Sequence, residues 1–104
     1  MELDLGVKDR LAIISMLPFN GTILEVSEIL DLVKLLKFSD EEIKKINYRE
    51  QDGKIMWDLD KEETRTFNLT FGQIQLLKKI VSKLDEEGKI DFNNFNICYR
   101  INKL

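Results

Sequence analysis

The sequence predicts a single α+β domain over residues 1–104, with four helices packed on a small antiparallel sheet in the order α-α-α-β-β-β-α. Three observations lead to this prediction. Apolar residues recur at helical spacing in three segments, and residues with capping-box spacing precede three of the predicted helices. An Asp-Gly pair between two short alternating segments indicates a β-hairpin.

The first two helices follow from the spacing of apolar residues. Residues 7–17 form the first helix, which ends because Pro18 keeps the residue before it out of the α region. Thr22 begins the second helix, since a glutamate three residues later completes a capping box. Its apolar stripe is wider than a surface helix needs, because it includes Leu32 and Leu35. We therefore expect the second helix to be central in the fold.

A short third helix is predicted from Ser39 to residue 45 or 46. Ser39 and Glu42 have the spacing of a capping box, and Phe38 and Ile43 occupy the positions of a hydrophobic staple. Two local rules therefore indicate the same starting residue for this helix.

Residues 46–59 are predicted to form the hairpin. Asp52 and Gly53 favour a two-residue type I′ turn, because both of its central residues need positive φ. The predicted register pairs Gln51 with Lys54, Glu50 with Ile55, and Tyr48 with Trp57. One face of the hairpin is then mostly polar, and we expect the other, aromatic face to cover the helical core. The aromatic face carries Ile46, Tyr48, Ile55, Trp57 and Leu59.

The rest of the chain predicts a strand, a long helix and a docked tail. Residues 64–69 alternate and contain β-branched side chains, so we expect a third strand that pairs with the second strand of the hairpin. Thr70 begins the last long helix, and Gly88 ends it. The tail, residues 90–104, is too apolar to stay free of the core, and we expect it to dock as an edge strand or as a short helix.

The residue types present argue against an enzyme. The chain has no histidine, which removes the commonest general base near neutral pH and the commonest zinc ligand. Cys98 is the only thiol, and we expect it to be a small buried core residue. No glycine pattern typical of phosphate binding occurs, and the Asp58-Leu59-Asp60 segment lacks the remaining ligands of a calcium loop. We expect no catalytic residue, no cofactor and no metal site.

The composition of the chain indicates which cellular compartment and which classes of partner to expect. Nineteen acidic residues against sixteen basic ones give a net charge of −3, so nucleic acid is not the expected partner. One cysteine cannot form an intramolecular disulfide, which is typical of a reducing compartment. No apolar stretch approaches the roughly 20 residues that span a bilayer. We expect a cytoplasmic protein without membrane association.

Two functional hypotheses remain. The first is a non-catalytic protein-binding, assembly or accessory protein, in which Leu32 and Leu35 contact a partner or a second copy in a homodimer; full burial in the monomer is the alternative for these two residues. The second is a winged-helix-like DNA-binding regulator, since three helices followed by a hairpin have the right order. Acidic residues in the first turn of the third helix argue against DNA binding, because that turn would meet the bases. Trp57 suits a core better than an interface. The candidate DNA contacts are Lys44, Lys45, Arg49 and Lys54.

Four segments share a pattern with a known family of proteins. They are residues 10–18, 38–43, 53–57 and 84–89. In these segments the chain resembles a small family of proteins of about a hundred residues that are encoded in bacteriophages and prophages. That family has no established activity, so the resemblance implies a phage-linked context and no particular site. The chain departs from the family at its last six residues, which replace a shorter acidic and aromatic ending.

Overall fold

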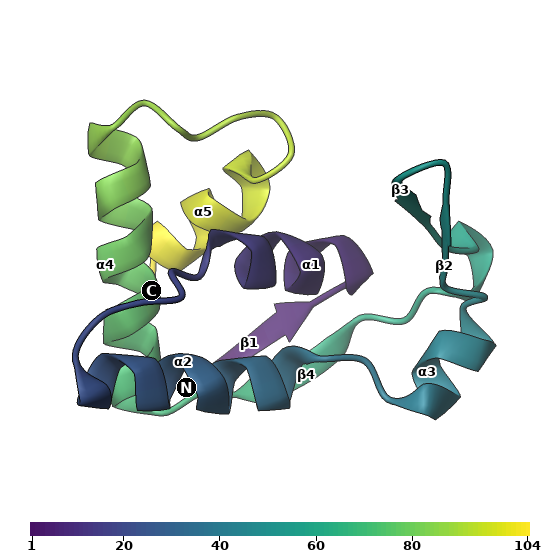
Figure 1. Cartoon of the computed structure of the whole chain (residues 1–104), viewed down its shortest axis with the longest axis horizontal. Helices are drawn as coiled ribbons and strands as arrows, with labels where there is room; N and C mark the ends of the chain where they lie inside the picture. The colour runs from purple at the N-terminus through teal and green to yellow at the C-terminus, as the bar shows by residue number, and fades with distance from the viewer.

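The computed structural model describes residues 1–104 and confirms the α+β class. Its α-helices and strands are β1 (Glu2–Leu5), α1 (Val7–Met16), α2 (Ile23–Leu36), α3 (Asp40–Lys45), β2 (Arg49–Gln51), β3 (Lys54–Met56), β4 (Arg65–Asn68), α4 (Phe71–Glu86) and α5 (Phe95–Asn102). A 3-10 helix, η1 (Leu59–Lys61), precedes β4. Helices α1, α2, α4 and α5 lie together with the β1–β4 pair, whereas α3 and the β2–β3 hairpin form the opposite end of the molecule (Figure 1).

The predicted third strand pairs with the N-terminus of the chain and not with the hairpin. β4 runs antiparallel to β1, with Leu3 opposite Phe67, and the hairpin strands pair only with each other. Leu3, Leu5 and Phe67 are all buried, so one face of this ladder closes the core. On the other face, the Thr66 hydroxyl donates a hydrogen bond to Asp4 Oδ1 at 2.5 Å. The prediction that this strand pairs with the second strand of the hairpin was therefore wrong. Beside β1, β4 buries Phe67 more completely than it could beside an exposed hairpin.

The register predicted for the hairpin is confirmed at the two pairs nearest its turn. Gln51 lies opposite Lys54 and Glu50 opposite Ile55, and Arg49 opposite Met56 is the last pair of the ladder. Tyr48 and Trp57 therefore lie just beyond the paired strands. Asp52 and Gly53 have φ of 53° and 74°, the left-handed conformations that a type I′ turn requires.

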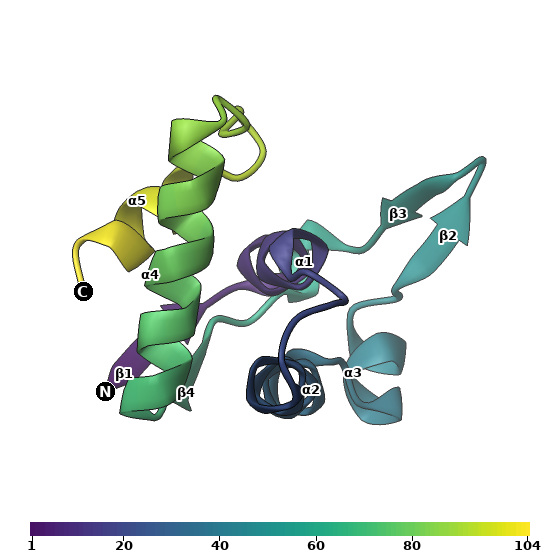
Figure 2. The same cartoon turned by 60° about the vertical axis from the view of Figure 1, so that its left-hand side comes forward.

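The hairpin does not cover the helical core as predicted. It projects from the molecule (Figure 2), and every residue of β3 is exposed. Within its aromatic face only Ile46 is buried, while Tyr48 and Trp57 are half-buried and Ile55 and Leu59 are exposed. The expectation fails because the β1–β4 sheet already closes the core, so the hairpin borders open surface beside α1.

The core is made mainly by α2, α4 and α5, together with the β1–β4 sheet. α2 and α4 begin with the predicted capping boxes, in which Thr22 and Thr70 each accept a hydrogen bond from the amide three residues later. The tail forms α5, which resolves the two options left open for it, and it packs against α4. No helix is both long enough and apolar enough to cross a membrane. Side chains buried from these three helices are Ile29, Leu32, Leu36, Ile74, Leu76, Leu77, Ile80, Val81, Ile97, Cys98 and Ile101.

Candidate functional site

Arg10 is a buried charged side chain that ties three helices together. It lies on α1 with only 1% of its surface exposed. Its Nε donates to the carbonyl of Leu36 and its Nη2 to that of Lys37, both at 2.9 Å. These carbonyls belong to the C-terminal end of α2, where helical carbonyls lack partners within the helix. The guanidinium also lies 4.0 Å from the centre of the Phe38 ring. Sequence reasoning missed this role, because an arginine on an amphipathic helix normally faces solvent.

Glu42 compensates the charge of Arg10 from the first turn of α3. Arg10 Nη1 donates to Glu42 Oε2 at 2.6 Å, and Glu42 Oε1 accepts from Arg65 Nη1 at 3.0 Å. The amide of Ser39 donates to the same Oε1 at 3.2 Å, which completes the predicted capping box. Hydrogen bonds from Arg10, and then from Ser39 and Arg65, lower the pKa of Glu42 from 4.5 to about 2, although partial burial opposes this. Glu42 is therefore ionised throughout the neutral range.

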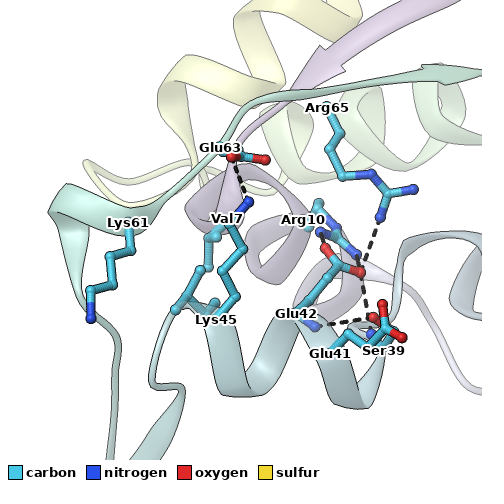
Figure 3. Close-up of a pocket in the computed structure, with 10 residues that line it drawn as sticks. Val7, Arg10, Ser39, Glu41, Glu42, Lys45, Lys61, Glu63 and Arg65 are labelled. Carbon is cyan, nitrogen blue, oxygen red and sulfur yellow. Dashed lines mark hydrogen bonds and ion pairs between the residues drawn. The ribbon is translucent and has the colours of Figure 1, made fainter.

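A charged cleft of about 230 Å³ surrounds this cluster (Figure 3). Lys45 reaches across it to Glu63 at 2.5 Å, and Arg65 reaches Glu42. Arg10, Glu42, Arg65, Lys45 and Glu63 thus bind one another within the cleft. We interpret the cleft as a support that holds α1, α3 and β4 in place. Its lining residues are Val7, Arg10, Ser39, Glu41, Glu42, Lys45, Ile46, Lys61, Glu63 and Arg65.

A larger and more apolar groove lies over the outer side of α1. Its volume is about 580 Å³, and it is bordered by the hairpin and by the connection between α4 and α5. The α1 residues that line it are spaced at i, i+3, i+4, i+6 and i+7, so they share a side of that helix. Two lysines are the only charged residues among its lining, and no carboxylate joins them. The lining residues are Lys8, Leu11, Ala12, Ile14, Ser15, Lys37, Phe38, Tyr48, Ile55 and Asn93.

Aromatic packing shapes one wall of this groove. The ring centroids of Phe38 and Tyr48 lie 5.6 Å apart, and the Phe38 ring also contacts the Arg10 guanidinium. Arg10 therefore fixes both the helix and one ring of the groove. Ile55 extends the wall along β3 and is 46% exposed. The groove thus combines a firmly anchored helix with apolar side chains that remain accessible.

The two residues predicted to contact a partner have different surroundings. Leu32 is completely buried in the core, so the prediction that it contacts a partner is corrected. The reason is that Leu32 lies with Ile29 and Leu36 on the buried side of α2, which packs against α4 and α1. Leu35 remains at the surface, with 37% of its area exposed.

The four basic residues named for DNA binding differ in their ionic contacts. Lys45 pairs with Glu63, and Arg49 lies 3.4 Å from Asp58. Lys44 and Lys54 are exposed and belong to none of the eight ion pairs. Half of the set is therefore engaged by carboxylates of the protein.

Trp57 and Cys98 both contact other parts of the protein and contribute to its packing. Trp57 is half-buried, and its indole Nε1 donates to Glu62 Oε2 at 3.1 Å. Glu62 Oε1 in turn accepts from the amide of Val7 at 2.7 Å, which connects the base of the hairpin to the start of α1. Cys98 is buried beside Met16, as predicted, and burial together with nearby Asp91 raises the pKa of its thiol.

Comparison with known proteins assigns no family to the chain. No family model matches it, and no curated protein or solved structure matches it either. The resemblance to phage and prophage proteins stays a prediction. Functional inference therefore depends on the groove and on the residues around it.

Proposed function

We propose that this protein is a non-catalytic binding module that holds a segment of a partner protein in the groove over α1. The observation that carries the proposal is the convergence of accessible apolar side chains on one hollow. Leu11 comes from α1, Phe38 and Tyr48 flank α3, and Ile55 comes from β3. Ile55 is exposed and the other three are half-buried, and apolar side chains that meet in a hollow are typical of binding sites.

The size and rigidity of the groove suit a binding site. Its volume of about 580 Å³ lies within the roughly 300–1,000 Å³ of typical ligand pockets. Arg10 anchors α1 to the end of α2 and to Glu42 of α3. A groove with a fixed floor loses less conformational entropy when a partner binds.

Selection of binding peptides tests this proposal. Displayed random peptides of about 16 residues, roughly four helical turns, are selected on the wild-type protein. Their affinities are then measured for Ala12→Trp, which places an indole in the groove, and for Ser27→Trp, which adds the same side chain to an exposed position of α2. Circular dichroism establishes that both variants are folded.

We expect peptides that bind the wild type and Ser27→Trp equally and Ala12→Trp at least about tenfold more weakly, which corresponds to about 1.4 kcal/mol. If no peptide binds, or if Ala12→Trp binds every peptide as well as the wild type, the groove is not the binding site.

Self-association through α2 is a second candidate, and the exposure of its outer side favours it. Ile23, Leu24, Leu30 and Leu35 are all exposed there, with Ile23 reaching 93%. Light scattering of the wild type and of a Leu30→Glu/Leu35→Glu variant tests this candidate. A dimer that the double variant converts to a monomer supports it, and a wild type that stays monomeric at high concentration refutes it.

A further inference from the structure

We propose that the segment held in the groove combines large apolar side chains with acidic residues. This inference rests on the binding function proposed above. It follows from the charge of the groove, where Lys8 and Lys37 lie beside apolar side chains and no carboxylate balances them. The protein as a whole carries a net charge of −3, so this local excess of positive charge is the reverse of the overall charge.

Both lysine side chains are available to a partner. They are exposed, and neither belongs to any of the eight ion pairs of the structure. Asp9, the carboxylate next to Lys8 in sequence, is engaged by Arg100 Nη1 and by the amide of Gly6, both at 3.0 Å. Lys45 shows the contrast, because Glu63 already holds its ammonium group at 2.5 Å.

The apolar lining decides which class of acidic partner suits the groove. Leu11, Phe38, Tyr48 and Ile55 offer apolar contact, whereas a nucleic acid backbone needs a dense row of basic side chains. Two lysines beside an apolar surface instead complement a peptide that carries carboxylates next to its apolar anchors. Such charges contribute mainly to partner selection and to the association rate.

The selected peptides provide the first test. Among peptides whose binding is weakened by Ala12→Trp, we expect aspartate and glutamate to be enriched beside apolar residues. Each enriched peptide is also synthesised with its carboxylates replaced by the corresponding amides. We expect these neutral peptides to bind several-fold more weakly, since exposed ion pairs contribute modestly.

Charge reversal in the protein provides the second test. Lys8→Glu/Lys37→Glu is compared with Lys34→Glu/Lys44→Glu, which changes the net charge equally at exposed lysines outside the groove. We expect the first variant to bind acidic peptides about tenfold more weakly and the second less than about twofold, at about 0.1 M salt. The difference should shrink at about 0.5 M salt because the charges are exposed. Circular dichroism confirms folding of both variants.

The outcomes separate this inference from the proposed function. Groove-dependent peptides without acidic enrichment, or insensitive to both charge changes, overturn the acidic partner and leave the binding function intact. The absence of any groove-dependent peptide overturns both. Tighter binding of a single-stranded oligonucleotide than of any selected peptide, lost in Lys8→Glu/Lys37→Glu, also overturns the inference and identifies a nucleic acid ligand.

Discussion

Replacing Glu42 by glutamine removes the charge that compensates buried Arg10. In the folded protein the pKa of Glu42 falls from 4.5 to about 2, and each pKa unit corresponds to about 1.36 kcal/mol, which gives about 3 kcal/mol of stabilisation at neutral pH. The Glu42 side chain is 23% exposed, so solvent screening reduces this to about 2 kcal/mol. We therefore expect Glu42→Gln to lower the free energy of unfolding by about 2 kcal/mol at neutral pH.

The pH dependence of this loss identifies its cause. Because the folded pKa of Glu42 is lowered, its stabilising effect is complete above the unfolded pKa and disappears as the pH falls through about 2. The difference between wild type and Glu42→Gln should thus be constant above pH 5.5 or so and shrink steadily below about pH 4.5. Urea unfolding followed by circular dichroism measures it at each pH.

A neighbouring carboxylate supplies the control. Glu41 is exposed and belongs to none of the ion pairs, so Glu41→Gln should change stability by less than about 0.5 kcal/mol. A Glu42→Gln protein as stable as Glu41→Gln at neutral pH, or one whose loss of stability is the same at every pH, would show that ionised Glu42 does not stabilise the fold through Arg10. The lowered pKa values of Glu25 and Glu87 do not interfere, since both residues are present in all three proteins.

Three further predictions concern the core, the turn and the thiol. Leu5→Ala should lower the free energy of unfolding by about 2–5 kcal/mol because Leu5 is fully buried. Leu59→Ala, at a residue 73% exposed, should lower it by less than about 0.5 kcal/mol. Equal losses in the two variants would contradict the burial of β1 in the core. Gly53→Ala should destabilise the hairpin by about 1–2 kcal/mol through its positive φ, since beyond its chain neighbours no atom lies within 4 Å of the added methyl group. Unchanged amide hydrogen exchange in β2 and β3 would argue against the type I′ turn. The Cys98 thiol should react slowly with a disulfide reagent in buffer and rapidly in urea, because it is buried and its pKa is raised; rapid reaction in buffer would show an exposed thiol.

Local signals in the sequence predicted much of the fold correctly. The boxes that begin with Thr22, Ser39 and Thr70 form as expected, because each needs only residues three positions apart. The turn at Asp52 and Gly53 likewise sets its own register. These features depend on neighbouring residues, so distant packing does not alter them.

Features that depend on distant segments were missed. β1 has only four residues, and its pairing with β4 joins positions from 60 to 66 residues apart. The buried state of Arg10 depends on carbonyls from α2 and on Glu42, which no spacing around Arg10 indicates. The sequence left a strand and a helix open for the tail, and the choice depends on packing, because Ile97, Cys98 and Ile101 form the buried side of α5.

The groove was missed for the same reason, because residues from distant segments form it. Its lining comes from α1, from both flanks of α3, from β3 and from the connection before α5. In the sequence, only the spacing of four residues could have indicated the groove, because it gives α1 a second, partly apolar side. These residues are Lys8, Leu11, Ala12 and Ser15. The widened stripe of α2 directed attention to Leu32 instead, because sequence does not distinguish a helix covered on several sides from one that awaits a partner.

The separation of the two sheets has a consequence for amide hydrogen exchange. The β2–β3 hairpin forms its own ladder, and the amides of Tyr48 and Asp58 bond to carbonyls near its base. The hairpin can therefore open without breaking the β1–β4 ladder, and its amides should exchange through a local event of low free energy while those of Leu3 and Phe67 require global unfolding. Since Ile55 forms a wall of the groove, an occupant would slow exchange in β3 without stabilising β4 to the same extent.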